Sequence, residues 1–264
     1  LAFRWLALPQ GSLFVVLLTL IALCAVATGH LDSALLSLCS QYSSRMQQHL
    51  QIGIGMGLLA SVLYRDLTKV LFPGAIADAT SVFFVVALVT ILVCVASYEL
   101  LMSLPVSARV RETPAVGGEP LLSEERGADA PEPRRPVEEG AVAHVAAVWR
   151  AVWRNQLAIC AHFALCTTCY PGLVTSVPCR QLTALQPAHW FQELLLTAFS
   201  TADVFGRFLT GRRFGLHHGN ILITVALRLA IFPLLLHCIA SPSATDALSW
   251  LVVAATGFSN GYCL

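Results

Sequence analysis

Residues 81–98 read Ser-Val-Phe-Phe-Val-Val-Ala-Leu-Val-Thr-Ile-Leu-Val-Cys-Val-Ala-Ser-Tyr, an apolar run without a charged side chain. Its length is close to the roughly 20 residues that an α-helix needs to cross the hydrocarbon core of a bilayer. Backbone polar groups in lipid must be satisfied internally, so a spanning segment is either a helix or part of a closed barrel. Barrel strands alternate apolar and polar residues. This run does not alternate, and it therefore predicts a membrane-spanning helix.

The composition extends this interpretation to the whole chain of 264 residues. Hydrophobic residues make up 56% and charged residues 12%, whereas a soluble domain has about 25% charged residues. The polar side chains are too few to cover a soluble domain of this length. Seven apolar segments have spanning length, and they lie near residues 11–40, 46–70, 78–103, 153–176, 190–211, 219–240 and 247–264. The predicted fold class is an all-α, multi-pass membrane protein built as a helical bundle.

A polar region from residue 104 to residue 148 separates the segments into two groups. It is rich in Pro, Gly, Glu and Arg, as in residues 127–136, Gly-Ala-Asp-Ala-Pro-Glu-Pro-Arg-Arg-Pro. Such a composition buries too little apolar surface to fold, so we expect a disordered loop between segments 1–103 and 149–264. Arg and Lys are more numerous in the connections on the side of this loop than on the other side. The positive-inside rule then predicts that the loop is cytoplasmic.

Two opposite charges, Asp203 and Arg207, lie four residues apart in the fifth apolar segment. This spacing puts them on one helical face, with the acid before the base. Ionisable groups within a membrane are costly unless they are paired or functional. The pair could lock helices together, but apolar packing would do that at little cost. The alternative is a polar site on a water-filled path, where the carboxylate accepts and the guanidinium donates hydrogen bonds to a hydroxyl-bearing solute. We favour the second interpretation.

Other ionisable groups in the apolar segments are His30, Asp32, His162 and Arg228. Arg228 could join the pair or bond helix carbonyls, and both alternatives remain open. We expect the two histidines to be satisfied core residues rather than proton carriers. The remaining motifs, Gly-Ile-Gly-Met-Gly at 53–57 and the Cys166-x-x-Cys169 pair, are expected to be small packing residues. Without a nucleophile–base pair, a metal-ligand array or a basic patch, the sequence predicts no enzyme, cofactor, metal or nucleic-acid partner.

Several stretches resemble one family of membrane carriers. Residues 199–207, Phe-Ser-Thr-Ala-Asp-Val-Phe-Gly-Arg, resemble the F-x-x-x-D-x-x-G-R pattern in the eighth helix of the equilibrative nucleoside transporters. Further similar stretches follow the family's order, and they are residues 29–33, 65–69, 170–172, 228–236 and 257–262. The resemblance covers nearly the whole chain.

The resemblance implies a fold like that of the major facilitator proteins, with eleven spanning helices, and transport by alternating access. About seven helices would be present here. Residues 1–103 would hold the end of helix three and about helices four to six, and residues 149–264 about helices seven to ten. The family's helix-eight Asp and Arg contact the ribose of the solute, a role that carries over to Asp203 and Arg207.

The same resemblance implies further site residues. Ser200 and Asp32 are candidates for solute binding, and Arg228, Asn260 and Pro171 for structural or gating roles. Other members have Asn where Ser200 stands, so selectivity for the nucleobase is expected to differ.

The sequence thus predicts a carrier of nucleosides, purine nucleosides among them, in the plasma membrane, with the solute and the lipid bilayer as its partners. The solute would move down its gradient, or with a proton if Asp32 or His30 titrates. Two alternatives remain: a carrier of nucleobases or sugars, and a truncated membrane protein that transports nothing. Because the chain begins with Leu1 and ends inside an apolar segment, we expect a piece of a longer protein.

Overall fold

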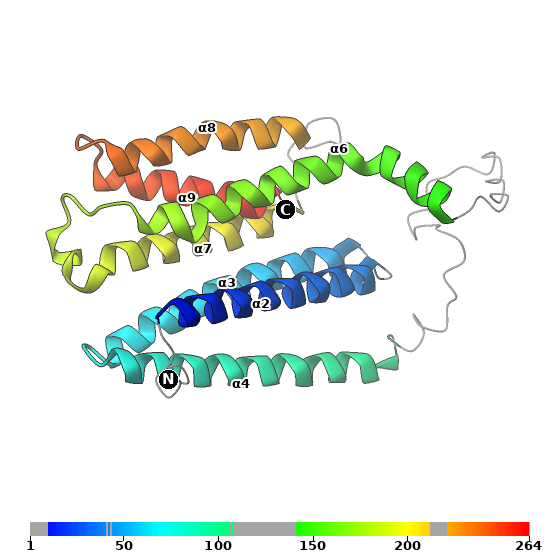
Figure 1. The fold of residues 1–264 in the computed structure, drawn as a ribbon, viewed down its shortest axis with the longest axis horizontal. Helices are drawn as coiled ribbons and strands as arrows, with labels where there is room; N and C mark the ends of the chain where they lie inside the picture. The colour runs from blue at the N-terminus through cyan, green and yellow to red at the C-terminus, as the bar shows by residue number, and fades with distance from the viewer. Residues whose placement is uncertain are drawn as a thin grey trace. The chain divides into compact units, whose positions relative to one another are not determined.

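The computed structural model describes residues 10–40, 42, 44–105, 107, 141–211 and 221–263. Every element in these ranges is helical, which confirms the all-α prediction for them (Figure 1). The long helices are α2 (Gln10–Ser40), α3 (Ser44–Leu71), α4 (Ile76–Ser103), α6 (Ala141–Thr167), α7 (Trp190–Leu209), α8 (Ile221–Ala240) and α9 (Asp246–Cys263). A π-helix η2 (Thr168–Leu173) continues α6, and two short 3-10 helices, η3 (Thr183–Leu185) and η4 (Pro187–His189), precede α7. Each predicted apolar segment coincides with one long helix.

Two stretches of these helices are long and apolar enough to cross a membrane, Phe14–Cys39 in α2 and Ile76–Ser103 in α4. A third apolar stretch, Arg228–Ala240 in α8, is shorter. The predicted seven spans therefore stay a prediction. Helix α7 shows why hydropathy alone does not identify it, because it carries Glu193 as well as Asp203 and Arg207.

The predicted loop from residue 104 to residue 148 is too long at its C-terminal end. Helix α6 begins at Ala141, so residues 141–148 are helical. They read Ala-Val-Ala-His-Val-Ala-Ala-Val, a stretch that contains neither Gly nor Pro and is rich in Ala, the strongest helix former. Apart from residues 104, 105 and 107, the rest of the predicted loop lies outside the described residues.

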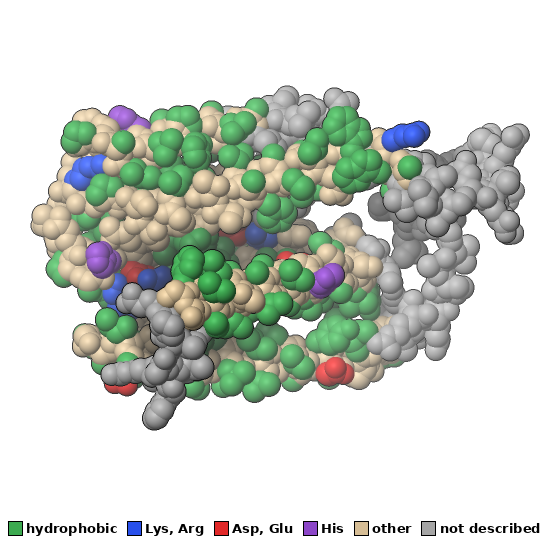
Figure 2. All heavy atoms as spheres, viewed as in Figure 1, with side chains coloured by type: hydrophobic (Ala, Val, Ile, Leu, Met, Phe, Trp, Pro, Cys, Tyr) green, Lys and Arg blue, Asp and Glu red, His purple; other side chains and the backbone are tan. Residues whose placement is uncertain are grey.

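The chain divides into two compact units. The first unit combines residues 1–54 and 63–119, and the second combines residues 55–62 and 120–264. In the first unit, α4 has no buried residue, and many of its apolar side chains are exposed; Leu88 and Leu92 are 56% and 59% exposed. A helix that is apolar on every side suits a lipid environment. Figure 2 shows hydrophobic side chains widely distributed over the visible face, with few charged ones among them.

The second unit contains the packed core, in which α7 and α9 run against each other at very short distance. A Cβ atom on Gly257 would overlap the backbone oxygen of Phe199, and one on Gly261 would overlap that of Asp203. Small residues let membrane helices approach this closely. Around this contact lie buried apolar side chains from the α6–α7 connection, α7, α8 and α9: Val174, Val177, Phe191, Leu195, Phe199, Leu235 and Val253. The close α7–α9 contact fixes which residues of α9 face Asp203.

Candidate functional site

Helix α7 buries one face, and the polar residues of the predicted site lie on it. The buried residues of this helix recur every three or four positions, which is the period of an amphipathic helix. Its buried members are Phe191, Glu193, Leu195, Leu196, Phe199, Ser200, Asp203, Val204, Gly206 and Arg207. The opposite face is apolar and open, with Phe205 at 60% exposure. Asp203 and Arg207 therefore point into the second unit.

The expected pairing of Asp203 with Arg207 is present. The Nε atom of Arg207 donates a hydrogen bond of 2.8 Å to Oδ2 of Asp203. Asp203 has no exposed surface and Arg207 is 4% exposed. Gly55, in the part of α3 that belongs to the second unit, lies against this pair, and a Cβ atom there would be 2.6 Å from Cδ of Arg207.

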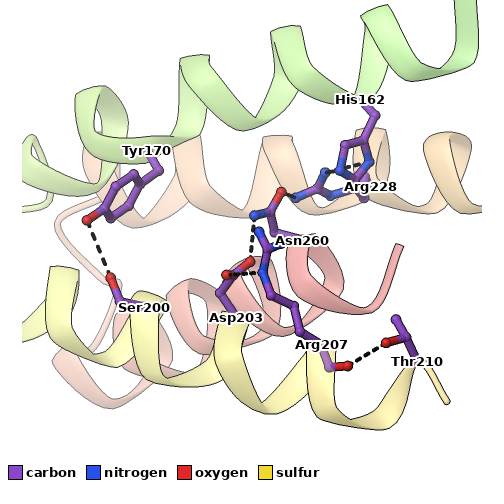
Figure 3. A network of polar contacts seen from close by, with 8 residues as sticks. All are labelled: His162, Tyr170, Ser200, Asp203, Arg207, Thr210, Arg228 and Asn260. Carbon is purple, nitrogen blue, oxygen red and sulfur yellow. Dashed lines mark hydrogen bonds and ion pairs between the residues drawn. The ribbon is translucent and has the colours of Figure 1, made fainter. Parts of the chain in front are cut away.

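Asn260 of α9 contacts the second oxygen of the Asp203 carboxylate. Its Nδ2 atom donates to Oδ1 of Asp203 at 2.6 Å. The carboxylate therefore receives one donor on each oxygen, from two different helices (Figure 3). Asn260 was expected to have a structural or gating role, and the structure brings it into direct contact with the pair.

Arg228 of α8 extends the network away from Asp203. Its Nη2 atom donates to Oδ1 of Asn260 at 3.0 Å, and its Nε atom donates to Oγ of Ser259 at 3.3 Å. Its Nη1 atom lies 2.8 and 2.9 Å from the two ring nitrogens of His162 on α6. Of the two alternatives for Arg228, the structure supports membership of the polar network, although Arg228 reaches Asp203 only through Asn260. Helices α6, α7, α8 and α9 each contribute one or more residues (Figure 3).

His162 is buried in this network, as expected for a satisfied core histidine. Its position opposite Arg228 has no local signal in the sequence, because the two residues are separated by 66 positions. Only the packing of α6 on α8 brings them together.

Ser200 lies one turn before Asp203 on α7. Pro171 lies in η2, at the break that follows α6. The hydroxyl groups of Ser200 and Tyr170 are 3.4 Å apart, and the Tyr170 ring stacks on Phe199 with centroids 4.3 Å apart. Tyr170 has non-helical backbone angles and precedes Pro171 inside η2. A proline inside a helix removes a backbone donor and kinks the chain. The kink turns the Tyr170 ring onto α7, but it does not test a gating role for Pro171.

Asp32 and His30 lie in α2 of the first unit, and both are exposed. The expectation that His30 is a satisfied core residue is therefore wrong, whereas the predicted roles of Asp32 and His30 in solute binding and proton coupling stay predictions. Among the described residues, no group of three or more His, Cys, Asp or Glu side chains is placed to hold a metal ion.

The Asp203–Arg207 pair is enclosed in this conformation. A small cavity beside the network is lined by Arg228, Thr256 and Ser259 together with apolar side chains, and it has room for about one water. Neither residue of the pair lines that cavity. A solute would reach Asp203 only after the surrounding helices move apart.

A second polar cluster lies at the end of the second unit, outside the predicted spans. The carboxylate of Asp246 accepts hydrogen bonds from the backbone N–H groups of Arg180, Gln181 and Leu182, at 3.0, 2.7 and 2.8 Å. The Arg180 guanidinium in turn donates to the carbonyl oxygens of Cys238 and Ile239 at the end of α8. Burial raises the pKa of the Asp246 carboxyl, but the backbone hydrogen bonds outweigh it and lower that pKa below its ordinary 3.8. We call this cluster the loop clasp, because it joins the α6–α7 connection to the α8–α9 connection.

Comparisons with known proteins agree with the family resemblance of the sequence. Residues 18–264 match the family model described as nucleoside transporter. Among curated proteins, the chain is similar to "Equilibrative nucleotide transporter 1" of Arabidopsis thaliana, with 24% identity over 257 residues. The match covers 92% of this chain and 52% of the relative, so the chain spans about half the length of the curated relative it matches. No solved structure matches.

Proposed function

Because this chain belongs to the nucleoside transporter family, we propose that it carries nucleosides across a membrane and that Asp203 and Arg207 hold the sugar of the solute. Family membership indicates a membrane transporter of nucleosides or nucleotides rather than an enzyme. Location in the plasma membrane, with residues 104–148 on the cytoplasmic side, belongs to the same proposal.

The observation that carries the proposal is the hydrogen bonding of the Asp203 carboxylate. Each of its oxygens accepts one hydrogen bond, from Arg207 and from Asn260. An ionised carboxylate has about four acceptor positions. Asp203 therefore keeps acceptor capacity for two more donors, which is what a pair of neighbouring sugar hydroxyls offers. Ser200, one turn earlier on the same buried face, would be placed to contact the same solute.

The arrangement argues against a simple helix lock. Asp203 and Arg207 belong to the same helix, so their ion pair does not join α7 to another helix. The cross-helix bond is the one from Asn260, which an uncharged acceptor could also receive. A buried ion pair within one helix is difficult to explain by packing, because apolar residues of similar volume would serve as well or better.

Enclosure of Asp203 fits transport by alternating access, in which the site opens to one side of the membrane at a time. We propose that the segment 1–103 and the segment 149–264 move against each other around this site. Solute would flow down its gradient, with proton coupling only if Asp32 or His30 titrates.

Uptake of labelled adenosine tests the proposal in cells that lack their own nucleoside carriers, with the complete coding sequence expressed. Asp203→Asn and Arg207→Ala should reduce uptake to background while the protein still reaches the membrane. Phe205→Leu is the matched control, because it lies between the two residues on the exposed face of the same helix. Normal uptake by the Asp203→Asn variant would remove this residue from the solute site.

A nucleotide is a second candidate solute. The guanidinium of Arg228 donates to His162, Ser259 and Asn260, and none of these three side chains is acidic. The polar network therefore carries two guanidinium groups for one carboxylate, an excess that favours an anionic solute. The similar Arabidopsis protein is also named for nucleotides. Unlabelled adenosine monophosphate, adenine and ribose are each tested as competitors of labelled adenosine uptake. The compound that competes identifies the solute class as nucleotide, nucleobase or sugar, and competition by none of them supports the nucleoside.

A further inference from the structure

We propose that Arg228 is a positioning residue, which orients the amide of Asn260 so that this amide donates to Asp203. This inference rests on the proposed function, since it assigns a role within the same solute site. Arg228 is 6% exposed, within an apolar helix. It has no carboxylate partner among the described residues, so an ion pair does not explain its burial. Its hydrogen bond to Asn260 does.

The amide of Asn260 has two different ends, and its two neighbours accept only one orientation. A guanidinium has donors and no acceptor, so the Asn260 oxygen must face Arg228. An ionised carboxylate has acceptors and no donor, so the Asn260 nitrogen must face Asp203. The distances of 3.0 Å on one side and 2.6 Å on the other correspond to this single orientation. Without Arg228, the Asn260 oxygen loses the donor that anchors it, and only the carboxylate still holds the amide.

Three partners hold the Arg228 guanidinium in place. Asn260 and Ser259 accept from it on the α9 side, and the imidazole of His162 accepts on the α6 side. A neutral imidazole has one acceptor nitrogen, whereas an imidazolium has none. His162 is therefore neutral in this arrangement. The orientation of one amide is determined by side chains from three helices.

The orientation matters for the solute because the Asn260 donor occupies one acceptor position on Oδ1 of Asp203. An amide held only at its nitrogen swings out of line with Oδ1, and this carboxylate oxygen then loses its donor. The carboxylate would then turn away, and the remaining acceptor positions would no longer match two hydroxyls. We expect weaker solute binding, seen as a higher KM, with a turnover per inserted carrier that changes less.

A double-mutant cycle on adenosine uptake tests whether Arg228 acts through Asn260. The variants are Arg228→Met, Asn260→Leu and the double variant, with uptake rates divided by the amount of protein in the membrane. We expect each single variant to raise KM by about tenfold, the size of one hydrogen bond to a charged group. If Arg228 acts through Asn260, the double variant has the KM of Asn260→Leu alone, because interacting residues are not additive.

Two further variants separate positioning from a general effect on folding. Arg228→Lys keeps a donor at this position and should recover part of the loss in KM. Leu229→Met, at an exposed neighbouring position of the same helix, should leave KM unchanged. If Arg228→Met does not reach the membrane, Arg228→Leu takes its place in the cycle, because leucine also lacks a hydrogen-bond donor.

The inference is overturned if KM of the double variant rises by the product of the two single increases, or if Arg228→Met keeps the wild-type KM. Either result leaves the proposed function intact. Absence of adenosine uptake by the wild-type protein would instead overturn the proposed function, and this inference would fall with it.

Discussion

Helix α4 in the first unit has no buried residue, whereas α7 in the second unit buries a continuous face that includes Asp203 and Arg207. Both helices have spanning length. Helix α4 is apolar on every side over residues 81–98, a composition that suits contact with lipid. Helix α7 keeps charges that lipid disfavours, and packs them against α9 through glycines that allow backbone contact. Under the proposed function, solute chemistry belongs to the helices whose composition looks least suited to a membrane.

The largest expected effect tests the lipid exposure of α4. Leu88→Asp puts a carboxylate near the middle of this helix, at a position that is 56% exposed. A single charge there costs about 2.5–3.5 kcal/mol of insertion free energy. We expect most of the variant to be absent from the membrane fraction, measured against total protein by blotting.

Leu88→Phe is the matched control, because it changes the volume at this position without adding charge. Full membrane recovery of Leu88→Asp would show that this face of α4 contacts protein or water instead of lipid. The contrast with α7 would then disappear.

A smaller effect is expected when a side-chain atom is added at the contact between α7 and α9. Gly261→Ala adds a Cβ atom that overlaps the backbone oxygen of Asp203, so the helices must separate. Overpacking of this kind costs about 1–3 kcal/mol of unfolding free energy. We expect a lower Tm of the purified protein and a higher KM for adenosine, because Asp203 and Asn260 move apart.

Gly29→Ala in α2 provides the comparison for that variant. No atom lies within 4 Å of the added Cβ atom there, and alanine is the better helix former. Its Tm should equal or exceed that of the wild type. Equal Tm values for the two variants would mean that α7 and α9 are less closely packed than described.

The sequence predicted those parts of the molecule that depend on local spacing. The ends of α4 follow from the apolar run around residues 81–98, and the Asp203–Arg207 pair follows from its i, i+4 spacing. Contacts between distant residues did not follow in the same way. Asn260 meets Asp203 across 57 positions and His162 meets Arg228 across 66.

Those long-range contacts depend on which face each helix turns toward its neighbour. For α9, the glycines at 257 and 261 decide this, because backbone contact is possible only along their side of the helix. The start of α6 was missed for another reason. Its first residues follow a Pro- and Gly-rich stretch, and composition averaged over such a window hides a helix that begins inside it.

A third prediction concerns Arg207, and it tests whether adenosine binding requires the guanidinium group or only a positive charge. Arg207→Lys keeps the positive charge, but an ammonium lacks the Nε atom that binds Asp203 at 2.8 Å. A guanidinium and an ammonium are not equivalent at such sites. We expect KM for adenosine to rise about tenfold, or about 1.4 kcal/mol, with little change in membrane recovery. An unchanged KM would indicate that charge alone suffices, and Phe205→Leu again serves as the control.

The smallest expected effect concerns the loop clasp, in which backbone N–H groups hold the buried carboxylate of Asp246. Because its pKa is lower in the folded protein, the ionised form contributes stability that is complete above the unfolded value of about 4. That contribution is lost as the pH falls through the folded pKa. Asp246→Asn removes the charge and one acceptor oxygen, and should cost about 1 kcal/mol at pH 7.

The pH dependence of Tm distinguishes this origin from a general packing effect. The difference in Tm between wild type and Asp246→Asn should be constant from pH 7 to about pH 5, and should shrink as the pH falls below the unfolded pKa. A difference that stays constant down to pH 3 would assign the role of Asp246 to shape instead of charge. Adenosine uptake at pH 7 should change little, because the loop clasp lies outside the predicted spans while the solute site lies within α7.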